Sequence, residues 1–131
     1  RTIDSDQSNE MADIAEALYY AKALSKKQTS LDKINDCVNK YPGNHYPLLA
    51  FCDIALKYND KSLLEEGLEK LEKIMTTRHF SIKTLNRYKA SLLALNGKTD
   101  EALKLIEKDL SRYPADSKER IVSKIKAFGA R

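Results

Sequence analysis

The chain has 131 residues, of which 42% are hydrophobic and 32% charged, with 23 lysine and arginine against 19 aspartate and glutamate residues. This length suits one domain, and no apolar run approaches the roughly 20 residues that a membrane-spanning helix requires. The 2 cysteines are too few for a disulfide scaffold, the 4 glycines and 3 prolines are too few for an all-β sandwich, and what remains is a soluble, mostly helical domain.

The start of the chain is polar and has no features of a signal peptide. We expect residues 1–9 to form a frayed stub or linker and residues 10–131 to form the domain. Because the chain begins with Arg1 and not with methionine, we expect a mature protein or, in preference, an excised part of a larger protein. The compartment, bacterial periplasm or cytoplasm, stays open.

Apolar residues at three- and four-residue spacing predict a first helix through residues 11–21. A short second helix carries its apolar stripe over residues 31–38, with Thr29 or Ser30 as the expected N-cap. The sequence Tyr-Pro-Gly-Asn at residues 41–44 ends it, because the proline disfavours a helical residue before it and the glycine permits a turn.

The third predicted helix, over residues 48–58, is apolar almost all round. It should therefore be buried on most of its sides. Asn59 and Asp60 are the expected cap of a fourth helix, which has leucines, isoleucine and methionine on one face over residues 63–75 and charged pairs at four-residue spacing on the others.

Three further helices are predicted in the last part of the chain. The fifth runs through residues 85–95 and stops at Asn96-Gly97, a common C-terminal stop. The sixth is opened by Thr99 or Asp100. An amphipathic stretch over residues 121–128 forms the seventh. Short connections between these helices indicate antiparallel neighbours.

Residues 85–114 read LNRYKASLLALNGKTDEALKLIEKDLSRYP, which resembles a tetratricopeptide repeat (TPR). Ala90 occupies the small position where the two helices of such a repeat cross, and Gly97 matches the turn glycine. Ala102 follows Asp100-Glu101 at the start of the second helix, and Pro114 closes the unit.

Two earlier units match the repeat more loosely. At the positions where the two helices of a unit cross, one unit has Ala55 and Gly67, and the other has Leu18 and Ser30. Ser30 to Gly67 is 37 residues and Gly67 to Ala102 is 35, against a repeat of about 34. The resemblance implies an all-α fold, a short TPR-like α-α superhelix (solenoid) of about three helical hairpins. The units are residues 10–43, 45–79 and 82–114, with a capping helix at 116–128. A generic helical bundle with one accidental match is the alternative.

Charge is unevenly distributed along the sequence. Residues 1–20 hold five acidic residues and one basic residue, and residues 118–131 hold five basic residues and one acidic residue. Residues 73–98 hold six basic residues and no acidic one. These segments are either ordinary solvated helix faces or a basic surface for an acidic peptide, a phosphate or a lipid headgroup.

No catalytic or cofactor motif is present, so this chain alone is not expected to be an enzyme or to bind a cofactor or metal. The two histidines, His45 and His79, are expected in loops as solvated or capping residues. Cys37 and Cys52 are either small core residues or a disulfide across the hairpin, and their spacing with His45 suits no zinc site. Nucleic-acid binding is not expected, because no reader motif is present.

The TPR resemblance implies a non-catalytic protein–protein interaction domain whose concave surface binds an unidentified protein or peptide. An apolar helix or extended segment is the expected ligand, because the lysine, asparagine and arginine set that grips carboxylates in some members is missing. The expected partner-binding residues are Tyr19, Lys22, Lys83, Thr84, Arg87 and Ser91, and Ala12, Ala15, Leu49, Cys52 and Leu56 share the same surface. The alternative is that Leu49 and Leu56 pack on the first unit and leave no groove.

Two other functions remain open. Similar degenerate repeats follow the membrane part of some bacterial O-antigen ligases and pilin glycosylases, so the chain resembles, more weakly, a periplasmic C-terminal domain of such a protein. A repeat domain of a bacterial transcription regulator is the further alternative. Segments upstream of this chain would separate them: membrane spans in the first case and a winged helix in the second.

Overall fold

The computed structural model describes residues 2–78 and 82–130, with side chains described for residues 9–74 and 84–130. Within these ranges the chain is helical with no strand, as the sequence predicts. The helices form two compact units, residues 1–77 and 78–131. Their bounds are α1 Thr2–Lys22, α2 Lys27–Lys40, α3 Tyr46–Lys57, α4 Lys61–Arg78, α5 Ile82–Leu95, α6 Thr99–Leu105, α7 Glu107–Leu110 and α8 Ala115–Gly129.

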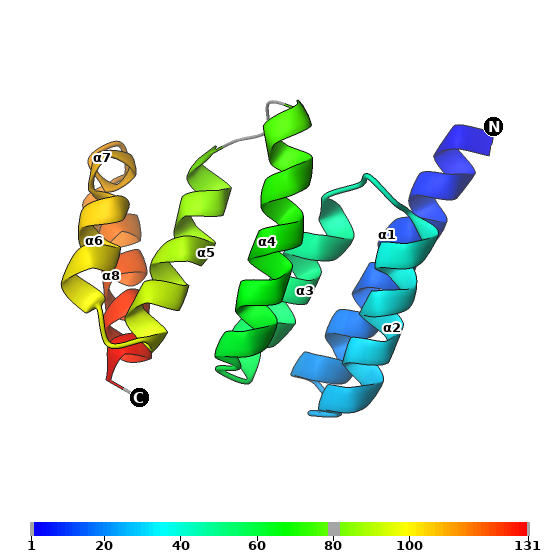
Figure 1. The fold of residues 1–131 in the computed structure, drawn as a ribbon, viewed down its shortest axis with the longest axis horizontal. Helices are drawn as coiled ribbons and strands as arrows, with labels where there is room; N and C mark the ends of the chain where they lie inside the picture. Colours follow the sequence, from blue (N-terminus) through cyan, green and yellow to red (C-terminus); the bar gives the residue numbers. More distant parts are fainter. Residues whose placement is uncertain (1, 79–81, 131) are drawn as a thin grey trace. The chain divides into compact units, whose positions relative to one another are not determined.

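The first unit is built on α1, α2 and α3, which lie beside one another (Figure 1). Their apolar faces meet in one buried cluster, because the three- and four-residue spacing puts those side chains on one side of each helix. The cluster consists of Ile14, Ala17 and Ala21 from α1, Leu31, Ile34 and Cys37 from α2, and Ala50, Phe51 and Ile54 from α3. The expectation that the third helix is mostly buried is confirmed.

Helix α4 approaches α3 at Gly67, a position predicted from sequence to hold a small residue. A Cβ atom placed on Gly67 would lie 2.8 Å from both Cys52 Sγ and Phe51 Cδ1. The atoms nearest to this position thus belong to Phe51 and Cys52. Any side chain here would have to displace an aromatic ring and a sulfur atom.

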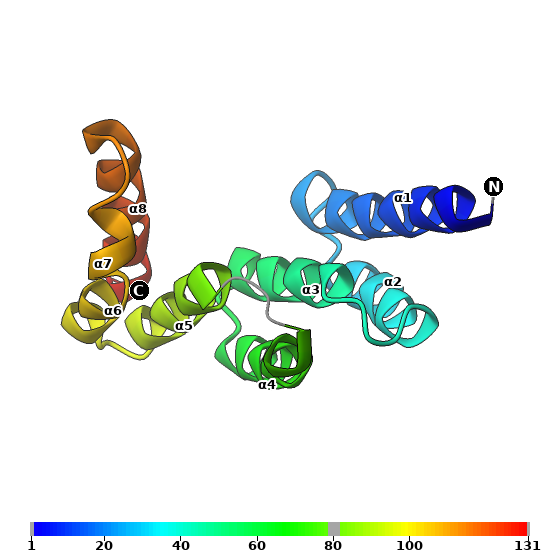
Figure 2. The same cartoon turned by 90° about the horizontal axis from the view of Figure 1, so that it is seen from above.

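The second unit packs α5 against α6 and α8 (Figure 2). Its buried cluster consists of Ala90, Ala94, Ala102, Ile106, Leu110 and Ile125. The two small residues that the repeat places at the helix crossing, Ala90 and Ala102, are completely buried in it. Helices can approach closely where both present only a methyl group, which explains why alanine occupies these positions.

The helix ends differ in part from the sequence predictions. Helix α1 begins at Thr2, so residues 2–9 are helical rather than a frayed stub. Helix α2 begins at Lys27 with Lys26 before it and no side-chain cap, so Thr29 and Ser30 lie inside the helix. The stop at Gly97 is confirmed, since its φ of +81° is the left-handed conformation that glycine adopts at a helix end.

Two further differences concern α6. It begins at Thr99 without a side-chain cap, so neither Thr99 nor Asp100 has the predicted capping role. The predicted sixth helix is also divided in two, because Ile106 leaves helical geometry with φ −101° and ψ 5°. The short α7 continues after this break.

Candidate interaction surfaces

The acidic residues of α1 are largely engaged within the first unit. Glu10, which is 6% exposed, accepts hydrogen bonds from Asn44 Nδ2 at 2.7 and 2.8 Å. Asp13 accepts one from the Tyr41 hydroxyl at 3.1 Å. Glu16 pairs with Lys33 at 2.9 Å. These carboxylates tie α1 to α2 and to the loop after it, so part of the negative charge near the chain start stabilises the hairpin.

The opposite face of α1 carries exposed apolar and aromatic side chains. Met11 is 52% exposed and Tyr19 is 57% exposed, and Ala12, Ala15 and Lys22 are exposed with them. The Tyr19 ring meets Tyr20 edge to face, with 6.2 Å between the ring centroids. All the residues that the repeat resemblance assigns to α1 are therefore accessible. We call Met11, Ala12, Ala15, Tyr19 and Lys22 the α1 face.

The residues assigned to α3 are less accessible. Cys52 is fully buried beside Gly67 and does not line a surface, contrary to the sequence prediction. Leu49 and Leu56 are half-buried. The apolar middle that the sequence predicts for a binding surface is therefore used in part for packing in the first unit.

The residues assigned to α5 make contacts within the second unit. The Arg87 guanidinium lies 5.1 Å from the centroid of the Tyr113 ring, a cation–π contact that the sequence did not indicate. Ser91 is 7% exposed and its hydroxyl donates to the Arg87 carbonyl at 3.0 Å, so it is not accessible to a partner. Thr84 is half-buried. The Lys83 side chain lies outside the described residues.

Cys37 and Cys52 are free thiols, and both are buried. Burial raises the pKa of both thiols, that of Cys52 to about 12. Of the two alternatives drawn from the sequence, small core residues fit this arrangement.

We expect both thiols to be inert in the folded chain, because the thiolate is the reactive form and burial suppresses it. A chromogenic disulfide reagent at pH 8 should react slowly with the native protein. In guanidinium chloride it should titrate the 2 thiols quickly. Fast native reaction would place a cysteine at the surface, and no reaction after unfolding would reveal a disulfide.

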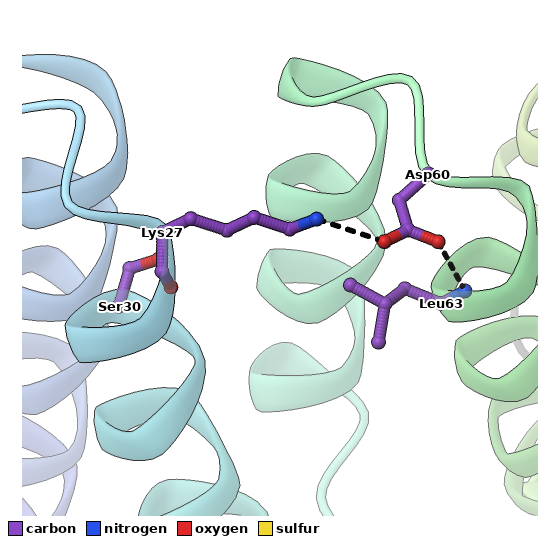
Figure 3. A network of polar contacts seen from close by, with 4 residues as sticks. All are labelled: Lys27, Ser30, Asp60 and Leu63. Carbon is purple, nitrogen blue, oxygen red and sulfur yellow. Dashed lines mark hydrogen bonds and ion pairs between the residues drawn. The ribbon is translucent and has the colours of Figure 1, made fainter.

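Lys27 and Asp60 connect the start of α2 to the start of α4 (Figure 3). Lys27 Nζ donates to Asp60 Oδ2 at 2.9 Å, and the Leu63 backbone N–H donates to Asp60 Oδ1 at 3.1 Å. Asp60 is thus the N-cap that the sequence predicts for this helix. Two hydrogen bonds hold the pKa of the Asp60 carboxyl below its ordinary value. The one from Lys27 has the larger effect and the one from the Leu63 backbone N–H the smaller.

Replacing Asp60 with alanine should lower the free energy of unfolding by about 1 kcal/mol at neutral pH, the usual cost of losing an N-cap. A carboxyl whose pKa is lower in the folded state stabilises above its unfolded pKa and loses that contribution as the pH falls through the folded value. The difference between wild type and Asp60→Ala should therefore shrink below about pH 4. Urea unfolding of wild type and variant at neutral pH and below about pH 4 measures this difference in the free energy of unfolding. Asp36→Ala, at an exposed position of α2, is the control and should change little.

The second unit contains an open hollow between α6, α7 and α8 that the sequence did not indicate. It has a volume of about 470 Å³ and is lined by Leu103, Lys104, Glu107, Leu110, Lys118 and Val122. The sequence shows only that Leu103, Glu107 and Leu110 share one helix face and that Lys118 and Val122 share another.

Other classes of site are not found in the part of the chain that is described. Its cysteine, histidine and acidic residues form no group that could hold a metal ion. His45 lies next to Tyr46, with 4.2 Å between the ring centroids, and His79 lies outside the described residues. None of the described helices is both long and apolar enough to cross a membrane.

Comparison with known proteins adds no relative. A scan against protein-family models finds no match, and neither a search of curated proteins nor one of solved structures returns a match.

Proposed function

We propose that this chain is a non-catalytic protein-interaction domain built from degenerate TPR-like hairpins. The observation that carries the proposal is the α1 face. Its Tyr19 and Met11 are 57% and 52% exposed, on a helix whose other side is packed into a buried cluster. Exposed apolar side chains that gather on one helix face are typical of interaction sites.

The composition of this face suits a protein partner. Tyrosine contributes strongly to protein interfaces, because its ring buries a large area and its hydroxyl remains hydrogen-bonded. The small side chains of Ala12 and Ala15 lie beside it and would let a helix or extended segment approach closely. Lys22 adds one positive charge at the end of α1.

The repeat part of the proposal is supported by where the small residues lie. Ser30, Ala90 and Ala102 are fully buried, and Gly67 stands against Phe51 and Cys52. These are the positions at which the repeat alignment requires close helix approach. The burial of small residues in all three units supports a repeat over a generic bundle with one accidental match.

The test is capture from an extract of the source organism with immobilised wild-type chain and two variants. Tyr19→Glu should abolish capture of specific proteins, because it places a charge in the middle of the α1 face. Tyr46→Glu is the matched control, since Tyr46 is 50% exposed but lies at the start of α3. Equal capture by both variants would contradict a role for the α1 face, and absence of any specifically captured protein would contradict the proposed function.

A further inference from the structure

The hollow in the second unit lies beside the helix break at Ile106. Ile106 is 1% exposed and points into the core. The helix axis is interrupted there, with Leu103 on one side of the break and Leu110 on the other. Val122 of α8 completes an apolar floor with these two leucines. Leu103 and Val122 are half-buried, so this floor is reachable from solvent.

The edge of the hollow is charged. Lys104, Glu107 and Lys118 line it, and all three are exposed. None of them forms an ion pair with another described residue. This contrasts with the first unit, where Lys27, Lys33 and Lys40 are paired with carboxylates. Among the described residues, the two lysines of the hollow therefore have no carboxylate partner within ion-pair distance that a ligand would have to displace.

The two units also differ in the sign of their charge. Residues 78–131 hold 13 basic and 6 acidic residues, a net charge of +7. Residues 1–77 hold 10 basic and 13 acidic residues, a net charge of −3. The modest total of +4 conceals this asymmetry. A strongly basic unit attracts anionic partners over distances of about a Debye length, roughly 8–10 Å at physiological salt.

We propose that the hollow binds an acidic peptide segment, with an apolar side chain seated on Leu103, Leu110 and Val122 and carboxylates facing Lys104 and Lys118. The proposal rests on the proposed interaction function and adds a second, charge-selective site to it.

Glu107 favours a peptide over an anionic lipid surface. A uniformly negative membrane would place phosphates against the exposed Glu107 carboxylate, whereas a peptide can place its few carboxylates against Lys104 and Lys118 alone. A peptide offers backbone N–H groups that this carboxylate can accept from, while its acidic side chains reach the lysines. The occupant is therefore a chain with donors as well as negative charges.

The experiment is selection of a displayed library of short random peptides on the intact chain. Enriched peptides should combine acidic with leucine-like or aromatic residues. The double variant Lys104→Glu/Lys118→Glu should weaken a selected peptide by at least about tenfold, as measured by fluorescence anisotropy, because it reverses the charges that the carboxylates contact.

The control is Lys98→Glu/Lys124→Glu, which changes the net charge equally at exposed positions of the same unit outside the hollow. It should weaken binding less than about threefold, since only long-range attraction is affected. Circular dichroism checks that both double variants fold.

Each alternative outcome overturns the inference. Enrichment of peptides without acidic residues, equal weakening by both double variants, or no enrichment would remove the site from the hollow. Tighter binding to phosphatidylglycerol vesicles than to any selected peptide, lost in Lys104→Glu/Lys118→Glu, would assign the hollow to a membrane surface. None of these results affects the capture experiment with Tyr19→Glu. The proposed interaction function is therefore tested separately from the site in the hollow.

Discussion

Replacing Gly67 with leucine should destabilise the first unit by about 1–3 kcal/mol, the usual cost of overpacking a filled core. The Cβ atom alone would lie 2.8 Å from both Cys52 Sγ and Phe51 Cδ1. Phe51 is 2% exposed and Cys52 is fully buried, so neither can move into solvent without opening the contact between α3 and α4.

One effect opposes this loss, because leucine favours a helix over glycine by roughly 0.8–1 kcal/mol. The steric term should win, since it involves the whole added side chain and not only the Cβ atom. Urea unfolding followed by circular dichroism gives the change. Glu65→Leu is the control, because Glu65 is an exposed residue of the same helix, and it should change stability by less than about 0.5 kcal/mol. A Gly67→Leu variant as stable as wild type would mean that α4 does not approach α3 at this residue.

Gly67 also illustrates what could be predicted from the sequence. Periodicity identified the helices, because a buried face must repeat at the spacing of a helical turn. The repeat alignment then selected Ser30, Gly67, Ala90 and Ala102 as small residues, and the structure buries Ser30, Ala90 and Ala102 completely. Both inferences depend on packing between neighbouring helices, because such packing requires apolar or small residues at regular spacing in the sequence.

Structural features that have no periodic residue pattern were not predicted from the sequence. The first turns of α1 are polar and carry no apolar period, so residues 2–9 read as a stub although they are helical. The break at Ile106 involves no proline or glycine. Because no residue type marks this break, the sequence predicts one continuous helix. The hollow beside the break was therefore not predicted.

The exposure of the candidate binding residues could be predicted only in part, for the same reason. The repeat register shows which residues face away from the partner helix, and it placed Tyr19 and Lys22 on an exposed face. It does not show which side chains are engaged by contacts distant in sequence. Arg87 stacks on Tyr113, and the Ser91 hydroxyl bonds to its own helix.

Replacing Ala90 with tryptophan should destabilise the second unit by about 3 kcal/mol or more, at or above the upper end of overpacking costs. Ala90 is fully buried among Ala94, Ala102 and Ile106. The small side chains of this cluster set the distance between α5 and α6. An indole ring can enter only if the two helices separate, which exposes the apolar residues packed beside them.

Ala127→Trp is the matched control, since Ala127 lies on the exposed side of α8, and its free energy of unfolding should stay within about 0.5 kcal/mol of wild type. The chain has no tryptophan, so each variant carries a single indole that reports on the second unit. Urea unfolding followed by indole fluorescence then reports on the second unit in both variants, and circular dichroism of the whole chain gives the comparison with wild type. A buried, blue-shifted indole at position 90 with wild-type stability would contradict the helix crossing. A large loss there, with none at position 127, would locate the close contact of α5 and α6 at Ala90.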